Sequence, residues 1–300
     1  MKILLTGGAG LIGRHAVDHL VREGHEVISL VREARPVPDG LAAPTREVIG
    51  DVGDRALVDG LVAGGVEAVV HLAAIPAPVG HTAVELLAAN ALTTMTVLES
   101  AGTHGVRHIV LASSMSVLGM AWSDELMHPV YLPVDEEHPL RPTEGYALSK
   151  EDDEAAARMA ARRWGVDVVA LRFPFTGTDE MIRTRALRAA HDEEEAVRAA
   201  KELWAYLDVR DATRAIALSL EASAAGVLGG SVVLNLTADD VLVDAQLPEL
   251  IEKWHPDVPV VAPLGNSAYN ISRARELIGF VPQHPLERGR QPDDAHAERN

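Results

Sequence analysis

The chain has 300 residues, of which 47% are hydrophobic, none is cysteine, and 27 Lys and Arg oppose 44 Asp and Glu for a net charge of −17. This charge argues against a nucleic-acid partner or an anionic-membrane surface, and the lack of cysteine excludes disulfides and thiolate metal sites. The hydrophobic content is enough for a globular core, and there is no apolar run of about 18 residues and no charged leader. We therefore expect a cytoplasmic protein.

The first strand runs directly into a glycine-rich loop. The apolar residues Ile3 to Leu5 predict a buried strand, and glycines follow at Gly7, Gly10 and Gly13. Gly7 and Gly10 allow a tight turn and close backbone approach, while Gly13 allows the next helix to pack on the sheet. Free amides at the start of that helix would face a pyrophosphate. Such a loop also occurs as an ordinary turn, so it needs support from the rest of the chain.

The residues that follow alternate between helical and strand patterns. The predicted elements are, in order, helix 14–23, strand 26–31, strand 47–49, helix 55–63, strand 68–72, helix 84–104, strand 109–112, helix 146–164 and strand 168–171. Alternating apolar strands and helices predict an α/β fold with a doubly wound parallel sheet, the Rossmann fold. The crossovers are expected to be right-handed.

Beyond Phe173 the regular alternation ends. A Pro-Phe-Thr-Gly turn precedes a charged helical stretch from Asp179 to Trp204, and a strand at 232–236 and a helix at 244–254 follow. The last residues are polar and have no periodic apolar face. The predicted organisation is a NAD(P)-binding Rossmann domain over 1–173 with late sheet contributions from about 205–236, a small C-terminal substrate-binding cap from 174–204 and 237–285, and a flexible tail over 286–300.

Candidate catalytic side chains lie near the middle of the chain. Tyr146 and Lys150 are four residues apart at the start of a predicted helix, so both project from one face. A phenol has a pKa of about 10, and a neighbouring ammonium favours its ionised form. Ser114 follows the strand 109–112, at the sheet edge where ligands bind in this architecture. Taken alone, Tyr146 and Lys150 are more typical of an exposed helix face, and Ser114 is more typical of an ordinary turn.

In this order, the motifs resemble those of the extended short-chain dehydrogenase/reductase family, which includes nucleotide-sugar epimerases and dehydratases. The resemblance runs through most of the chain. Its landmarks are Thr6 to Gly13, Gly50-Asp51-Val52, His71-Leu72-Ala73-Ala74, Asn90, Ser114, Tyr146, Lys150, Tyr206 to Asp211 and Ser272 to Phe280.

The resemblance implies hydride transfer at a nicotinamide. Tyr146 would exchange the substrate proton, Lys150 would tune Tyr146 and hold the ribose, and Ser114 would position the reacting oxygen. Asn90 would have a supporting role, or would satisfy backbone groups as a buried helical residue. The implied cofactor contacts are Gly7, Gly10, Leu11, Ile12, Gly13, Arg32, Asp51, Val52, Leu72, Ala73, Ala74, Asn90, Tyr146, Lys150 and Phe173, and the implied substrate contacts are Ser116, Phe175 and Trp204.

The second strand ends differently from that of the family members that prefer NAD, which usually carry an acidic residue there. This chain has Leu30-Val31-Arg32-Glu33. Arg32, helped by Arg14 or Arg35, would pair with a 2′-phosphate by charge-assisted hydrogen bonds. NADP(H) is therefore favoured, while NAD(H) remains the alternative if Glu33 faces the ribose.

Other departures bear on the reaction and the substrate. Met115 and Ser116 stand where dehydratases of the family carry Asp and Glu, which disfavours dehydration. Trp204 stands where nucleotide-sugar enzymes usually carry an arginine for the diphosphate, and a second expected arginine near 263–265 is absent. We therefore expect a small sugar-like or natural-product substrate. Cap arginines at 183, 185 and 188 would offer a substitute clamp or pair with nearby carboxylates at the surface, and Trp204 would contact the substrate or simply pack in the core.

These observations predict an NAD(P)-dependent oxidoreductase that acts on a secondary alcohol or its carbonyl. The alternative is an epimerase that uses the same three residues and retains NAD, and a more remote one is a non-catalytic NADP-sensing protein. The helices 84–104 and 146–164 resemble those that pair in family homodimers. The 13 histidines form no His-Glu-x-x-His motif, so no metal is expected. The segments 75–82, 119–138 and 173–206 are expected to select the substrate.

Overall fold

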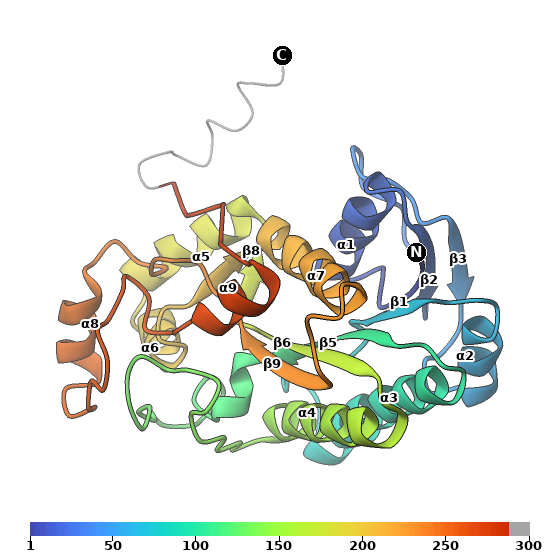
Figure 1. Ribbon diagram of the computed structural model, residues 1–300. Helices are drawn as coiled ribbons and strands as arrows, with labels where there is room; N and C mark the ends of the chain where they lie inside the picture. The colour runs from blue at the N-terminus through green and yellow to red at the C-terminus, as the bar shows by residue number, and fades with distance from the viewer. Residues whose placement is uncertain (288–300) are drawn as a thin grey trace.

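The computed structural model describes residues 1–287 and centres on a seven-stranded sheet (Figure 1). The strands are β1 (Lys2–Thr6), β2 (Glu26–Val31), β3 (Arg46–Ile49), β4 (Ala68–His71), β5 (His108–Ser114), β6 (Asp167–Phe173) and β9 (Ser231–Asn235). Their order is β3-β2-β1-β4-β5-β6-β9, and every pair is parallel. The chain reverses its direction of travel across the sheet between β1 and β4, which confirms the predicted doubly wound fold.

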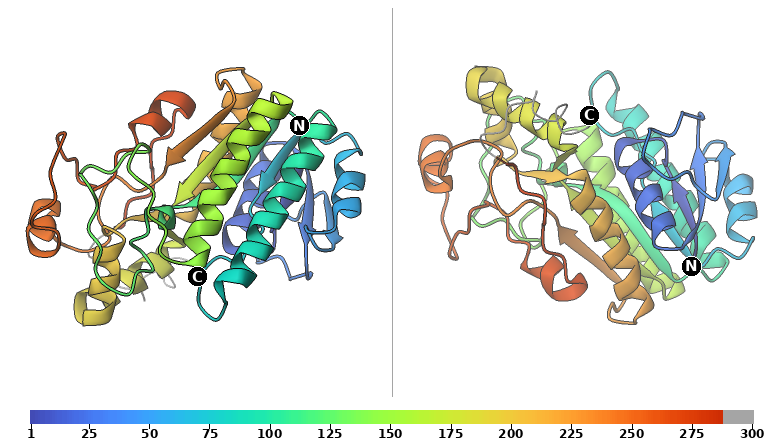
Figure 2. Two further views of the ribbon diagram at one scale, coloured as in Figure 1. Left: turned by 90° about the horizontal axis from the view of Figure 1, so that it is seen from below. Right: turned by 90° about the horizontal axis from the view of Figure 1, so that it is seen from above.

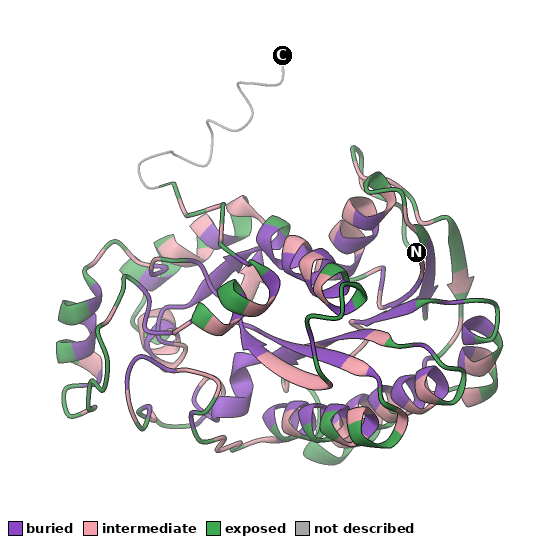
Figure 3. Ribbon diagram, in the orientation of Figure 1, coloured by how far each residue is buried: buried purple, intermediate pink, exposed green. Residues whose placement is uncertain are grey.

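Two helical layers cover the sheet (Figures 1 and 2). One layer consists of α1 (Leu11–Arg22), α7 (Val209–Ala224) and α9 (Ser272–Ile278), and the other of α2 (Arg55–Val62), α3 (Ala83–Thr103) and α4 (Gly145–Trp164). Because both faces are covered, the inner strands are continuous apolar runs, as the buried strands in Figure 3 show. α3 and α4 lie side by side on the lower face (Figure 2).

A second apolar core forms the cap beside the carboxyl ends of the strands. The cap elements are α5 (Asp179–His191), α6 (Glu193–Lys201), α8 (Leu247–Trp254), the 3-10 helix η1 (Met115–Leu118), and the short parallel strands β7 (Phe175–Gly177) and β8 (Tyr206–Asp208). Their core contains Met120, Leu132, Trp204, Tyr206 and Leu250. The cap therefore gathers segments that are far apart in the sequence.

The structure corrects several predicted boundaries. The charged stretch is two helices, because the Asp192 carboxylate accepts hydrogen bonds from the amides of Glu194 and Glu195 and starts α6. β8 pairs with β7, so of the late segment 205–236 only β9 joins the main sheet. Between them lies α7, a 16-residue helix that the sequence analysis did not predict.

Two segments pack in a different core from the one predicted for them. α9 falls within the predicted cap range, yet Ala274, Ile278 and the following Phe280 pack with α7 in the core of the Rossmann domain. The residues from Met115 to Val134 fall within the predicted Rossmann range, yet they pack in the cap core. In both cases long-range packing decides the assignment.

The predicted tail begins at Leu286, whose backbone amide donates to the Tyr206 hydroxyl at 2.7 Å and whose side chain packs on the cap core. Residues 288–300 lie outside the described part of the chain. Within residues 1–287, none of the helices is both long enough and apolar enough to cross a membrane.

Candidate active site

The glycine loop between β1 and α1 forms a cradle made of backbone. Gly7 has a positive φ of 79°, and a Cβ there would lie 2.7 Å from the amide nitrogen of Ala73. A Cβ on Gly13 would lie 2.1 Å from the carbonyl oxygen of Gly7. Gly10 begins α1 without a side-chain cap, so the amides of Leu11 and Ile12 in the first helical turn remain available to an anion.

Charged side chains surround the ends of β2 and β3. Arg32, Glu33 and Arg35 are exposed after β2 and line the same cavity as the glycine loop. Within residues 1–287, Arg32 forms no ion pair, so its guanidinium is available to a ligand. Asp51 follows β3 and accepts a hydrogen bond from the amide of Gly53 at 2.7 Å, while Val52 is buried beside it.

A buried histidine at the end of β4 ties the loop after this strand to β1. The Nδ1 atom of His71 lies 2.7 Å from the Thr6 hydroxyl oxygen, which also accepts from the Ala73 amide at 3.3 Å. Burial, with the nearby charge of Lys150, lowers the pKa of His71 to about 3. The imidazole is therefore neutral at physiological pH. This arrangement holds Leu72 and Ala73 against the glycine loop.

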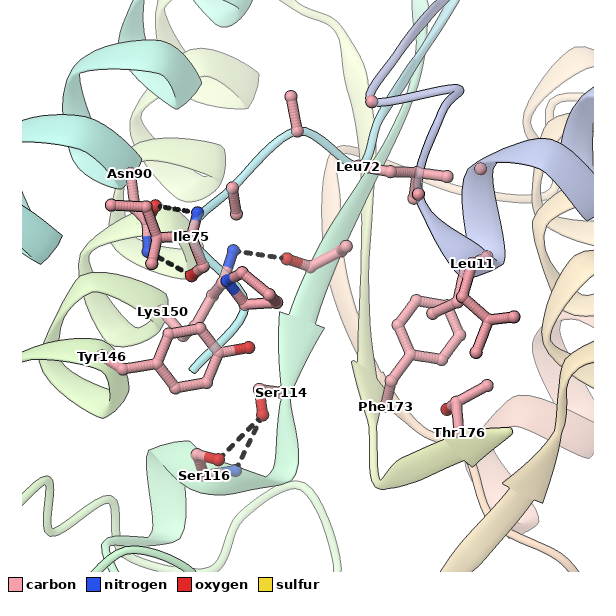
Figure 4. Close-up of a pocket in the computed structure, with 18 of the residues that line it drawn as sticks. Leu11, Leu72, Ile75, Asn90, Ser114, Ser116, Tyr146, Lys150, Phe173 and Thr176 are labelled. Atoms are coloured by element: carbon pink, nitrogen blue, oxygen red, sulfur yellow. Dashed lines mark hydrogen bonds between the residues drawn. The ribbon is translucent and has the colours of Figure 1, made fainter. Parts of the chain in front are cut away.

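Asn90, on α3, forms hydrogen bonds to neighbouring residues of the protein. Its Oδ1 atom accepts from the Ile75 amide at 2.8 Å, and its Nδ2 donates to the Ile75 carbonyl at 3.2 Å and to the Ser149 hydroxyl at 3.0 Å. The side chain is buried at the cavity wall, and its amide is used in these bonds (Figure 4). The structure thus shows the alternative role, a buried residue that satisfies backbone groups, while the implied cofactor contact stays a prediction for this residue at the cavity wall.

Ser114, Tyr146 and Lys150 meet at the carboxyl end of β5. The Ser114 hydroxyl donates to the Ser116 hydroxyl at 3.0 Å and accepts from the Ser116 amide at 3.1 Å. Figure 4 shows the Tyr146 and Ser114 hydroxyls facing the same space, with Lys150 behind the phenol ring. The Lys150 Nζ atom lies 6.0 Å from the centre of that ring. The geometry thus brings a phenol, an ammonium and a hydroxyl to one point.

The first turn of α4 holds Tyr146 in place. Glu144 caps this helix, and its carboxylate accepts from the Tyr146 amide at 2.5 Å and from the Ala147 amide at 2.7 Å. A carboxylate at a helix N-terminus also interacts favourably with the helix dipole. Glu144 was not among the predicted site residues. The signal that could have found it is an acidic residue directly before the predicted helix.

All of the predicted site residues except Trp204 line one cavity of about 1640 Å³. The predicted residues along its wall are Gly7, Gly10, Leu11, Ile12, Gly13, Arg32, Asp51, Val52, Leu72, Ala73, Ala74, Asn90, Ser114, Ser116, Tyr146, Lys150, Phe173 and Phe175. The cavity runs from the glycine loop, past Tyr146, to the cap.

Trp204 lies elsewhere, and its predicted substrate contact is wrong. It is 2% exposed in the cap core, its ring meets that of His255 edge-on at 5.8 Å, and its carbonyl accepts from the Leu242 amide at 2.8 Å. Its backbone and that of Leu203 are left-handed, with φ values of 55° and 53°. This turn after α6 directs the indole into the core rather than into the cavity.

Aromatic and paired charged groups line the cap end of the cavity. The Arg185 guanidinium lies 4.3 Å from the centre of the Phe175 ring and donates to the Glu202 carboxylate at 2.8 Å. Arg198 lies 5.2 Å from the centre of the Trp122 ring and pairs with Glu195 at 3.4 Å.

Several of these cap residues were not predicted as contacts. Trp122 falls in the weakly patterned segment 119–138, where substrate selection was expected. Tyr269 also lines the cavity, but no local motif marks it, because only tertiary packing brings it there. Lys201 donates to the carbonyls of Ser123 and Asp124, which ties α6 to the loop carrying Trp122.

Among residues 1–287, no group of three or more His, Asp and Glu side chains comes together as metal ligands. The cavity's chemical groups are instead those of a nucleotide cradle joined to a phenol, an ammonium and a hydroxyl.

The fold and this cavity define an extended short-chain dehydrogenase/reductase. The model of the NAD dependent epimerase/dehydratase family matches residues 3–235, and the chain belongs to that family.

Three proteins illustrate the similarity. The chain is 27% identical to a UDP-glucose 4-epimerase of Corynebacterium glutamicum, over 95% of this chain and 92% of that protein. It is 33% identical to a uronate dehydrogenase of Pseudomonas putida, over 57% of this chain and 59% of that protein. A short-chain dehydrogenase/reductase superfamily protein of Agrobacterium tumefaciens, solved with bound NAD, is 26% identical with a TM-score of 0.71, covering 100% of this chain and 97% of that one.

A nicotinamide dinucleotide fits the residues present. The missing Cβ atoms at Gly7 and Gly13 let the glycine loop pack directly on the backbone of Ala73 and of Gly7, which shapes a tight cradle for a pyrophosphate, and the start of α1 offers free amides. The family's dependence on NAD, together with the NAD bound to the Agrobacterium protein, supports this class of cofactor.

Proposed function

We propose that the protein is an NAD(P)-dependent oxidoreductase that interconverts a secondary alcohol and a carbonyl group. The observation that carries this proposal is the meeting of Ser114, Tyr146 and Lys150 in one cavity, between the glycine cradle and the cap lining. The bound nicotinamide supplies the hydride acceptor or donor. The rest of the reaction needs a group that exchanges a proton with the substrate oxygen and a group that holds this oxygen in place.

The three side chains have distinct roles in this proposal. Tyr146 exchanges a proton with the substrate oxygen, as a general base during oxidation and a general acid during reduction. The Lys150 ammonium favours the ionised phenol, because an opposite charge nearby stabilises the phenolate. The Ser114 hydroxyl hydrogen-bonds to the same substrate oxygen and orients it. Ser116 already bonds to Ser114 and fixes its rotamer.

The proposed cofactor preference is for NADP(H). Arg32 and Arg35 line the cavity at the end of β2, where they can pair with a 2′-phosphate. Glu33 lies between them and would favour NAD(H) instead if it bound the ribose hydroxyls. The exposed position and unused guanidinium of Arg32 support the first alternative.

Nicotinamide fluorescence tests this preference. Cofactor-stripped protein would be titrated with NADPH and NADH, using wild type, Arg32→Ala, and Arg107→Ala as a control at an exposed arginine directly before β5, at the amino ends of the strands. We expect Arg32→Ala to weaken NADPH binding roughly tenfold, about 1.4 kcal/mol, and to leave NADH binding unchanged. Equal affinity for the two cofactors in wild type would contradict the NADP(H) preference, and no binding of either would contradict the enzyme proposal.

The substrate is proposed to be a small sugar-like molecule or natural product with little negative charge. Of the cap cations along the cavity, Arg185 and Arg198 are paired with Glu202 and Glu195, whereas Arg188 and Lys201 form no ion pair among residues 1–287. A diphosphate could use only Arg188 and Lys201 without breaking an existing pair. Phe175 and Trp122 instead offer apolar ring surfaces.

An epimerase that retains NAD is the second candidate, favoured by the similarity to the Corynebacterium enzyme along 95% of the chain. Both reactions use the same three side chains, so the two candidates have to be distinguished by measuring the products of turnover. With a panel of sugars and UDP-sugars, an oxidoreductase changes nicotinamide absorbance in proportion to product. An epimerase converts the sugar without net change and copurifies with cofactor. Cofactor binding without either reaction would favour a sensing protein.

We also propose a homodimer formed through α3 and α4. Both helices carry exposed apolar side chains, with Val84 at 76%, Leu92 at 58% and Leu148 at 38% exposure. Covering such side chains favours association. Sedimentation is expected to show a dimer at micromolar concentration that Leu92→Asp dissociates, whereas a wild-type monomer would contradict the proposal.

A further inference from the structure

A buried carboxylate lies directly beside the ammonium of Lys150. Asp153 is three residues further along α4, so both side chains point to the same buried side of the helix. The Asp153 Oδ2 atom accepts a hydrogen bond from Lys150 Nζ at 3.0 Å. The two side chains are only 5% and 3% exposed, so water does little to screen this ion pair.

This contact holds the ammonium in a defined orientation. An ammonium has three donors, and Lys150 uses one on Asp153 and one on the Ala112 carbonyl at 3.0 Å. One donor remains for a ligand in the cavity. Asp153 Oδ1 is buried and finds no hydrogen bond among the described residues, so Lys150 is the main partner of this carboxylate.

We propose that Asp153 is a positioning residue that keeps the buried Lys150 side chain charged and oriented beside Tyr146. The assignment rests on the proposed function for what that charge does. Asp153 itself lies behind Lys150 and does not line the cavity.

Among the charged groups packed around Lys150, Asp153 is the carboxylate that pairs with it. Burial opposes the ammonium form, but the attraction and hydrogen bond of Asp153, together with the attraction of Tyr146, outweigh burial and raise the pKa of Lys150 above its ordinary value. His71 on β4 is neutral, and Asp152 on α4 is exposed. Glu154 already forms a buried ion pair with Arg172 on β6 at 2.8 Å. The Thr94 side chain on α3 hydrogen-bonds to Asp153 but carries no charge.

Lysine NMR gives a test that needs no substrate, because the sequence has only four lysines, Lys2, Lys150, Lys201 and Lys253. Protein labelled with ¹³C at lysine Cε would be titrated with base, and the Lys150 signal assigned by its loss in Lys150→Arg. We expect Asp153→Asn to lower the pH at which Lys150 titrates, while Asp152→Asn, which removes an exposed carboxylate one residue away, leaves it unchanged.

Two outcomes would overturn the assignment. One is the same Lys150 titration in Asp153→Asn and wild type. The other is a wild-type Lys150 that titrates below the ordinary lysine value, and this measurement holds even if Asp153→Asn fails to fold.

The pH profile of turnover gives a second readout. If Asp153 keeps Lys150 charged, kcat/KM of Asp153→Asn falls on the alkaline side by about tenfold for each pH unit above the new lysine pKa. An equal loss at every pH would instead indicate a merely structural role and overturn the assignment. A protein without any turnover, but with the expected NMR shift, would contradict the proposed function and leave the role of Asp153 toward Lys150 intact.

Discussion

The two ends of the large cavity are built in different ways. At the nucleotide end, the surface is formed mainly by backbone atoms of the glycine loop. This loop can pack so tightly because Gly7 and Gly13 have no Cβ. At the cap end, side chains converge from distant segments, among them Trp122, Arg185 and Tyr269. A backbone cradle accepts a constant ligand, whereas a surface of side chains can change one residue at a time. Cofactor binding is thus tied to the local chain, and substrate choice to tertiary packing.

The largest expected effect is that of Tyr146→Phe, which should lower turnover without weakening cofactor binding. Tyr146→Phe removes the proton-exchanging hydroxyl and leaves the ring in place, so kcat should fall by about 10²- to 10⁴-fold. The dissociation constant for the cofactor should stay within about twofold of wild type, as measured by nicotinamide fluorescence. Full turnover in this variant would remove Tyr146 from the mechanism.

A pair of tryptophans tests the cap end. Trp204→Ala empties a buried site and should lower the free energy of unfolding by about 3–5 kcal/mol. Trp122→Ala, at the cavity wall, should change stability by less than about 1 kcal/mol and raise KM. Urea unfolding and steady-state kinetics measure both. A stable Trp204→Ala protein with a raised KM would restore the original substrate contact.

A pair of glycines tests the nucleotide end. A Cβ at Gly13 would collide with the Gly7 carbonyl at 2.1 Å, so Gly13→Ala should weaken cofactor binding about a hundredfold, or ~2.7 kcal/mol. Gly60 is the matched control, since a Cβ there meets nothing within 4 Å in α2. Gly60→Ala should leave binding unchanged and stabilise the helix by about 0.5–1 kcal/mol. Unaltered binding in Gly13→Ala would refute the cradle.

The last prediction concerns acid stability at the nucleotide end, where the effect near neutral pH is small. The pKa of His71 is about 3 in the folded chain and 6.5 ordinarily, so the unfolded state binds a proton that the folded state resists. Stability is therefore complete above pH 6.5 and is lost as the pH falls towards 3, by about 1.4 kcal/mol per pH unit.

Urea unfolding at several pH values checks this contribution. His71→Gln should remove that part of the slope, while His191→Gln, at an exposed site, should retain it. The same slope in His71→Gln and wild type would show that other groups cause the acid sensitivity.

Much of the Rossmann domain could be predicted because its signals are local. The predicted strand 26–31 matches β2, and the predicted helix 146–164 matches α4 to within one residue. Apolar runs and helical periodicity mark such elements without knowledge of their partners. α7 was missed although Ala212, Ile216 and Leu220 recur at helical spacing on its buried side, which is a local signal of a helix.

The site shows the same division. The glycine loop and the Tyr146–Lys150 spacing are visible in the sequence, since each depends on residues within one turn. The sequence also offers two interpretations of Asn90, and only the structure reveals its bonds to Ile75 and Ser149 and its place at the cavity wall. Trp204 was misplaced because a family position was carried over without knowledge of the left-handed turn that directs its indole inward.

By itself, then, the sequence determined the parallel sheet, the nucleotide loop and the candidate catalytic side chains, because strand burial, glycine geometry and helix spacing act over a few residues. Only the tertiary structure decided which side chains complete the cap end of the cavity, that Trp204 belongs to the core, and that Asp153 pairs with Lys150 out of water. These depend on burial, which arises when distant segments pack together and exclude solvent.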